Sequence, residues 1–306
     1  MMKKVLLAAF GCILAFSAFA GDVFADDQQG ETKAVDEKYG PPIVVYGANL
    51  SKEQKEKTKQ LLRVDEEPEV IEITVTGEDI KKYINGDPNS RMYSSAKITR
   101  LKEGEGIQVI QLTPENITEV TDSMYANALI TAGVKDAKIE VASPIKVTGH
   151  SALTGIFKAY ENTGEKLDTA RLETANEELN VVTDLVKKGG VDEEKASQLL
   201  TEIKQDIAEN KPASREEVEK IVEEELKNLK IDLTDEQKRM LIDLFDKIRQ
   251  LDIDYSQVKD QLADLSKTIK SKLEEAGVDE GFFRSLWNVI KDFFRSVVDF
   301  VKGLFG

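Results

Sequence analysis

The sequence lacks most of the side chains from which enzyme active sites and metal centres are built. Its 306 residues include one histidine, His150, and one cysteine, Cys12. Cys12 lies within the apolar N-terminal run, so a chain that has lost this run forms no disulfide and depends on packing for its stability. Zinc prefers histidine and cysteine ligands, which are missing here. The composition therefore predicts no metal site and no cofactor.

Positive charge is also scarce relative to negative charge. The chain has 42 lysines and arginines against 57 aspartates and glutamates, and its net charge is −15. Such a surface repels the phosphates of nucleic acids and anionic lipids at long range. We therefore expect no nucleic-acid partner.

The N-terminus has the layout of a cleaved secretory signal. Lys3 and Lys4 precede an apolar run from Val5 to Phe19, and two sites of the form small-x-Ala end at Ala20 and Ala25. The run is too short to favour a membrane span. We expect cleavage near Ala20 or Ala25, and a mature protein that is secreted or associated with the extracellular face of the cell envelope.

Residues 43–162 predict a domain of mixed strands and helices. Val70–Val75 alternates apolar and polar residues, as a half-buried strand does. Tyr93–Leu101 and Ile107–Leu112 flank a glycine-containing turn, so we expect them to pair as a hairpin. Thr113, followed by proline, predicts a helix over residues 115–132 that ends at a glycine.

A strand gives way to a helix near Gly149-His150-Ser151, which is the setting of a nucleophile elbow. Leu153 occupies the second glycine position of that motif. A serine triad also needs a histidine that approaches from elsewhere in the fold, whereas His150 is the neighbour of Ser151. We interpret the segment as a helix start in which Ser151 or Thr148 is the cap and His150 is exposed.

Two further site types depend on carboxylates. Asp252, Asp254 and Ser256 have the first spacings of a calcium loop, but Gln257 replaces its glycine and Ala263 its final glutamate. We interpret this segment as a helix cap. The many other carboxylates leave a carboxylate-pair hydrolase open, although the sequence singles out no pair.

Residues 165–276 predict an acidic helical domain. Apolar residues recur at spacings of three and four, and capping boxes begin helices at Ser214 and Thr234. Helices of this kind, joined by short turns, pack as hairpins or a bundle.

The C-terminal segment, residues 280–306, predicts an amphipathic helix whose apolar and polar residues occupy opposite halves of the helical wheel. Such a helix packs against the helical domain, lies in a membrane interface, or forms a surface for a protein partner or a second copy. The predicted binding residues are the aromatics Phe282, Phe283, Trp287, Phe293, Phe294, Phe300 and Phe305, with the basic residues Arg284, Lys291, Arg295 and Lys302 on one polar flank.

The clearest motifs of the strand-containing part are Val141–Gly149, Ala152–Ile156 and Lys158–Glu161. Weaker ones are Gly47–Leu50, Ser94–Ala96, Gly106–Ile107, Asn116–Thr118, Met124–Leu129 and Thr131–Gly133. With these motifs the chain resembles an uncharacterised secreted family of Gram-positive bacteria, known as domain of unknown function 1002, the YpuA-like proteins. The resemblance is densest between residues 46 and 161, and it implies no particular reaction or ligand.

Together these patterns predict an α+β protein, with a mixed strand and helix domain followed by an all-α hairpin or bundle region and the amphipathic segment. Residues 1–25 are the predicted signal peptide and residues 26–42 a flexible leader. We expect a non-enzymatic exported cell-envelope protein that acts through binding surfaces, attached to a membrane surface or a protein partner by its C-terminal helix. The alternative is a secreted hydrolase that uses Ser151 or an unidentified carboxylate pair. The sequence leaves the oligomeric state open.

Overall fold

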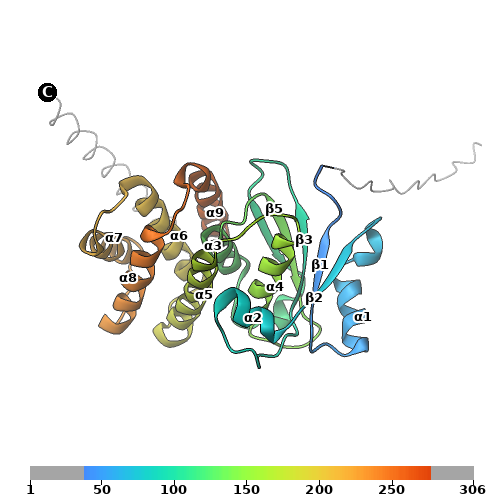
Figure 1. Ribbon diagram of the computed structural model, residues 1–306. Coiled ribbons are helices and arrows are strands. Elements are labelled where there is room, and N and C mark those ends of the chain that lie inside the picture. Colours follow the sequence, from blue (N-terminus) through green and yellow to red (C-terminus); the bar gives the residue numbers. More distant parts are fainter. Residues whose placement is uncertain (1–37, 277–306) are drawn as a thin grey trace, which may run out of the picture. The chain divides into compact units, whose positions relative to one another are not determined.

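The computed structural model describes residues 38–276, and this part of the chain has the predicted α+β class (Figure 1). Its strands form a single five-stranded sheet in the order β2-β1-β3-β5-β4. The strands are β1 (Ile43–Gly47), β2 (Ile71–Val75), β3 (Ser95–Arg100), β4 (Ile107–Gln111) and β5 (Ala137–Ala142).

The predicted hairpin between β3 and β4 is wrong, because β5 lies between these two strands. β5 pairs antiparallel with β3, from Ser95 opposite Ala142 to Arg100 opposite Ala137, and parallel with β4. Almost every residue of β5 is buried, whereas β4 alternates between half-buried and exposed residues. One face of β5 carries Lys138 and Glu140, and Glu140 lies directly opposite Lys97 of β3, with which it pairs at 3.0 Å. This cross-strand pair compensates the buried charge and supports the interior position of β5.

Two helices cover the opposite faces of the sheet. Helix α4 (His150–Glu161) packs against β1, β2 and β3, and helix α1 (Lys52–Leu61) lies on the other side (Figure 1). Gly155 permits the close approach of α4, since a Cβ atom there would lie 3.2 Å from Val45 Cγ1. On the α1 side, Val44 and Tyr46 form a smaller cluster with Leu62 and its neighbours.

Helix α3 (Asp122–Ala132) starts later than the sequence pattern predicted. Thr113 and Pro114 open only a short 3-10 turn, and the α-helix begins after Thr121, whose hydroxyl accepts from the Met124 N–H. The delay has a local cause, because Asn116 and Thr118 form backbone hydrogen bonds with Val147. That bridge holds the chain extended where a helix would otherwise continue. The predicted end at Gly133 is confirmed, with φ of 90°.

The expected cap of α4 is also wrong. The residue before the helix is Gly149, with φ of 105°, and no side chain caps the helix. Gly149 is enclosed: a Cβ atom there would lie 2.8 Å from both Ile117 Cγ2 and Tyr125 Oη. The Tyr125 hydroxyl donates to the Gly149 carbonyl at 2.6 Å. Tertiary packing therefore fixes this helix start, and neither Ser151 nor Thr148 does so.

The remaining helices begin close to the positions that the sequence predicts. Asp192, Ser214 and Thr234 each cap a helix through their side chains, as expected. These elements are α2 (Gly77–Ile84), α5 (Thr169–Gly189), α6 (Glu193–Asn210), α7 (Arg215–Asn228), α8 (Asp235–Gln250) and α9 (Tyr255–Glu275). None of the helices within residues 38–276 carries an apolar stretch long enough to cross a membrane.

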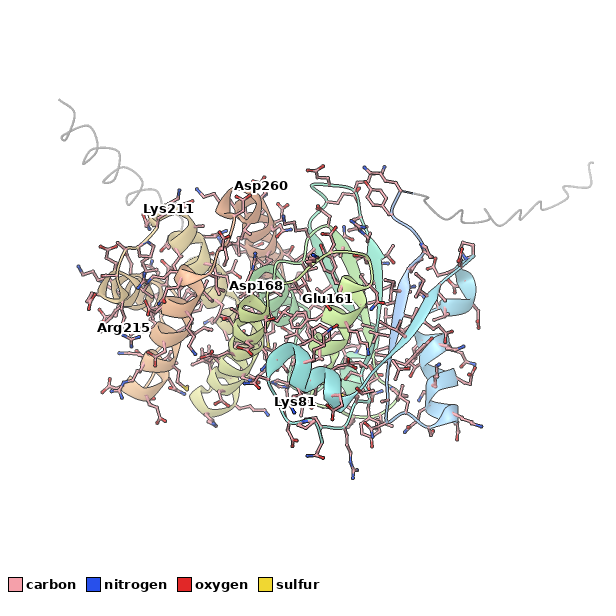
Figure 2. The ribbon with its side chains drawn as sticks, viewed as in Figure 1. Lys81, Glu161, Asp168, Lys211, Arg215 and Asp260 are labelled. Atoms are coloured by element: carbon pink, nitrogen blue, oxygen red, sulfur yellow. The ribbon has the colours of Figure 1, made fainter. Side chains whose placement is uncertain are left out.

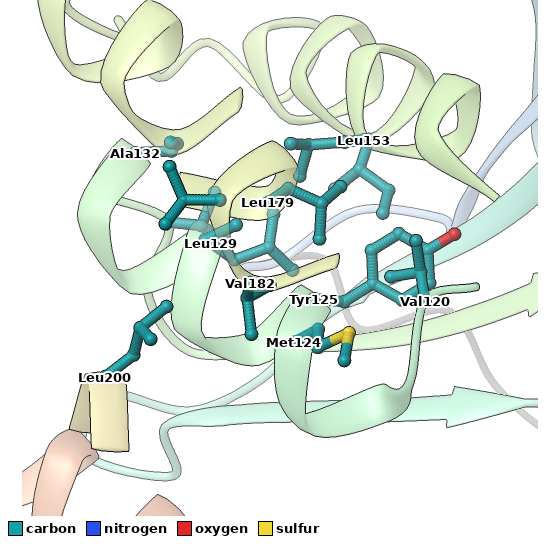
Figure 3. Packing of buried hydrophobic residues seen from close by; sticks show 14 of the residues in the cluster. Val120, Met124, Tyr125, Leu129, Ala132, Leu153, Leu179, Val182 and Leu200 are labelled. Carbon is teal, nitrogen blue, oxygen red and sulfur yellow. The ribbon is translucent and has the colours of Figure 1, made fainter. Parts of the chain in front are cut away.

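Most of the buried hydrophobic residues of the strand-containing part and of α5 to α8 belong to one continuous cluster. Figure 3 shows part of it, where Leu129 of α3, Leu153 of α4 and Leu179 of α5 point toward one another. A second cluster joins α9 to Ala126 and Ile130 of α3, with Ile107 and Val109 of β4 packed against it. Helix α3 therefore connects the sheet to both groups of helices.

A buried ion pair lies among these helices. Lys204 of α6 donates to the carboxylate of Glu178 on α5 and, at 2.8 Å, to the backbone carbonyl of Asn127. The Thr131 hydroxyl donates to the Glu178 carboxylate at 2.6 Å. Lys204 and Glu178 are 3% and 1% exposed. Burial lowers the pKa of Lys204 below its usual range. The two charges are buried where no solvent reaches them, so we assign them to the fold.

Candidate functional site

The predicted binding surface between Phe282 and Phe305 lies outside the described residues. Its aromatic and basic residues, from Phe282 to Phe305, all lie beyond residue 276. The surface therefore stays a prediction.

His150 is not exposed as predicted, since its side chain retains 26% of its accessible surface. Its ring contacts Thr183 Oγ1 at 3.3 Å and lies 4.0 Å from the Glu119 carboxylate. Burial lowers the pKa of the imidazole. Thr183 belongs to α5 and Glu119 to the segment before α3. The ring is therefore part of the packing around the start of α4.

A groove lies beside β4 in the described part of the chain. Its volume is about 970 Å³, at the upper end of the range of roughly 300–1,000 Å³ for ligand sites. One wall is formed by β4 and the 101–106 loop, and the other by α9, with α3 between them. We call it the β4 groove. Its apolar floor consists of Ile107, Val109, Ala126, Ile130 and Leu265.

The edge of β4 opens into the β4 groove. Ala137 donates to the Gly106 carbonyl and Leu112 donates to the Val141 carbonyl, so alternate residues from Gly106 to Leu112 direct their backbone groups toward β5. Ile107 and Val109 direct theirs the other way. Among the described residues no strand pairs with that side of β4. Such an unpaired edge is a ready surface for another polypeptide segment.

One end of the β4 groove is closed by an ionic cluster around Asp122. The Asp122 carboxylate accepts from the Gln111 N–H at 2.9 Å, which blocks the edge of β4 at that residue. Lys272 of α9 lies 4.0 Å from this carboxylate, and contacts Ser123 Oγ at 3.3 Å and Glu194 at 3.4 Å. Burial raises the pKa of Asp122, and Lys272 opposes that rise. These contacts join α3, α9 and α6.

The other end is formed by the loop between β3 and β4. Asp136, whose φ is 42°, accepts from the N–H groups of Gly104 and Gly106 at 3.0 and 2.9 Å. These bonds hold the loop against the start of β5. Next to them, Arg100 pairs with Glu165 at 3.0 Å. The loop is therefore fixed by side-chain contacts at its base.

The rim of the β4 groove is acidic on both walls. Glu103 and Glu105 project from the loop, and Asp260 and Asp264 from α9, all of them exposed. Figure 2 marks Asp260 at the outer surface of that helix. Asp264 pairs with Lys267 of its own helix. Within residues 38–276, no lysine or arginine side chain pairs with the other three carboxylates, although Glu105 accepts from the Lys102 N–H at 3.1 Å. The lining also includes Lys38, Arg100, Lys135 and Lys272, so a positively charged group of a ligand would be favoured at the acidic rim formed by the loop and α9.

Within the described part of the chain, no group of three metal-ligating side chains is close enough to hold an ion. Asp122, whose pKa is raised by burial, accepts from the Gln111 N–H and faces Lys272. It therefore fixes the wall of the groove, and the arrangement suits an apolar, cationic ligand.

Reasoning from the sequence missed the β4 groove. The sequence predicts a strand at Ile107–Leu112, but its assignment to a hairpin hides the free edge of β4. The helix expected to begin at residue 115 also obscured Asp122, which is the first residue of α3. The local pattern does not separate the two strands, because β5, with Lys138 and Glu140 between apolar residues, alternates much as β4 does.

Comparison with known proteins gives two matches. A family model described as Protein of unknown function (DUF1002) matches residues 46–265. An uncharacterized protein named YpuA from Bacillus subtilis (strain 168) is 39% identical over 274 residues, which covers 85% of this chain and 92% of that protein. No solved structure matches this chain.

Proposed function

Since the chain belongs to the DUF1002 family of proteins of unknown function, as its motifs predicted, we propose a function from its own residues. The protein is a non-enzymatic, exported component of the cell envelope that acts by binding. Export rests on the signal-like residues 1–25, and binding rests on the β4 groove. The C-terminal segment supplies attachment to a membrane surface or a protein partner.

The observation that carries the proposal is the combination of features in the β4 groove. It has an apolar floor, an unpaired strand edge and an acidic rim in one place. Apolar pockets with a few polar groups are the usual form of binding sites. The residues around it engage one another in structural contacts, so they can hold a ligand in place without reacting with it.

Attachment to the membrane follows from the sequence between Phe282 and Phe305. An amphipathic helix with aromatics on one side and basic residues on the flank lies in the plane of a lipid interface. Each lysine or arginine near an anionic surface contributes about 1 kcal/mol. The four basic residues of this segment therefore offset the long-range repulsion expected from an acidic chain.

Sedimentation with vesicles tests the attachment. Full-length protein is mixed with vesicles of phosphatidylglycerol and phosphatidylcholine, and the bound fraction is compared with that of a variant in which all four basic residues become glutamine. We expect the bound fraction to fall at least tenfold. The matched control replaces four exposed lysines elsewhere, Lys52, Lys57, Lys102 and Lys227. Equal loss in both variants would refute specific attachment.

The non-enzymatic part has its own test. A fluorophosphonate probe is added to wild-type protein and to Ser151→Ala. We expect no labelling of either protein, because the His150 ring contacts Thr183 and Glu119. Labelling that disappears in Ser151→Ala would instead support the hydrolase.

A further inference from the structure

We propose that residues 282–305 of the same chain dock in the β4 groove as a helix antiparallel to α9. This inference deepens the proposed function, since it names the occupant of the groove when no membrane or other partner is bound. Three observations on the groove and the sequence support it: apolar character, charge and reach.

The apolar surfaces match. The floor of the β4 groove is a strip of aliphatic side chains, of which Ile107 and Val109 are only partly buried. The apolar half of the C-terminal segment carries aromatic side chains, which bury the largest areas of all residues. Covering Ile107 and Val109 with that half would remove both apolar surfaces from water.

The charges match as well. Asp260 and Asp264 are four residues apart on the wall that α9 presents to the groove. Lys291 and Arg295 are four residues apart on the polar flank of the C-terminal segment. Residues with this spacing lie about 5–6 Å apart on one face of a helix. Two antiparallel helices can therefore place each basic residue opposite one carboxylate.

The length of the connecting chain allows this placement. Lys272 lines the β4 groove, and α9 ends at Glu275, within one helical turn. The sequence that follows, Gly277 to Gly281, has the length and the glycines of a turn between antiparallel helices. A hairpin centred there brings Lys291 and Arg295 within about one helical turn of Asp264 and Asp260, a distance that their long side chains can span.

Docking has a functional consequence. One apolar half-wheel cannot lie in the β4 groove and in a membrane interface at the same time. Docking in the groove and attachment to a membrane would therefore compete for the same segment. Such coupling is reciprocal by thermodynamic necessity.

The test uses the single tryptophan of the chain, Trp287, which belongs to the apolar half of the segment. Its fluorescence in the full-length protein, without lipid, reports whether that half is covered. We expect emission typical of an apolar environment and weak quenching by acrylamide. The measurement is independent of vesicle binding, so a failure here leaves the proposed function standing, and failed sedimentation leaves docking standing.

Charge reversal separates docking from other causes of protection. In Asp260→Lys/Asp264→Lys, two attractions become repulsions, and we expect the ratio of docked to undocked segment to fall about tenfold. The matched control, Glu219→Lys/Glu223→Lys, reverses two exposed carboxylates with the same spacing on α7. We expect this control to quench as the wild type does.

Restoring the opposite charges completes the test. Adding Lys291→Glu/Arg295→Glu to the reversed α9 variant should return acrylamide quenching to the wild-type level. Equal quenching of Trp287 in wild type, reversed variant and control would overturn the proposal. Protection that appears only as protein concentration rises would assign the segment to a second copy, and would overturn docking within one chain.

Discussion

Glu225 of α7 gives the sharpest prediction about stability, because its removal should stabilise the protein. The side chain is 6% exposed and faces carboxylates of α6. Burial, followed by the charge of Asp206, raises its pKa to about 8, although Asn228 opposes the rise by donating to it at 2.8 Å. Burial and the charges of Glu202, Glu209 and Glu224 similarly raise the pKa of Asp206 to about 7.

The size of the effect follows from these values. A rise from the ordinary 4.5 to about 8 corresponds to roughly 4–5 kcal/mol at 1.36 kcal/mol for each tenfold change in proton affinity. Relaxation that lets water reach the ionised group reduces such penalties. We therefore expect Glu225→Gln to stabilise the folded state at alkaline pH by about half of this, roughly 2 kcal/mol.

The upward direction of the Glu225 pKa shift sets the pH range in which the two proteins differ in stability. The folded state holds the Glu225 proton more tightly than the unfolded state does, so its contribution to stability falls as pH rises from about 4.5 to about 8. Urea denaturation followed by circular dichroism should give equal stabilities for wild type and Glu225→Gln near about pH 5. The variant should be the more stable protein near about pH 8.5.

The matched control is Glu223→Gln, an exposed residue of the same helix. Its stability should differ from that of the wild type by the same small amount at every pH. Parallel pH curves for wild type and Glu225→Gln, or a variant that is less stable than wild type at the higher pH, would refute the reasoning.

Two other substitutions test the packing, both by urea denaturation. Lys204→Met leaves Glu178 buried without its partner and should cost about 3–5 kcal/mol, whereas adding Glu178→Gln should recover at least half; no recovery would contradict the ion-pair argument. Gly149→Ala combines positive φ with contacts of 2.8 Å and should cost about 1–3 kcal/mol more than Gly164→Ala, where φ is +93° but nothing lies within 4 Å. Equal costs would show that the enclosure of Gly149 relaxes easily.

The local signals in the sequence predicted most element boundaries. Asp192, Ser214 and Thr234 cap helices where their side chains can reach the free N–H groups three residues on. Gly133 ends α3 because it adopts a left-handed conformation that other residues resist. These effects act over a few residues, so the sequence alone contains them.

The β4 groove could not be predicted in the same way. Its location depends on β5 entering between β3 and β4, which is a contact between segments about 30 residues apart along the chain. It also depends on α9 packing on α3, which joins residues separated by more than a hundred positions. Capping and periodicity contain no information about such contacts.

The sequence by itself determined the α+β class, the helix ends that short-range hydrogen bonds fix, and membership of the family. It also contains the amphipathic pattern between Phe282 and Phe305, because periodicity is a property of neighbouring residues. Only the tertiary structure decided which strand lies at the edge, which glycine begins α4 and where carboxylates gather around an apolar floor. The physical reason is that burial depends on contacts between distant segments, and the same local pattern is compatible with several of them.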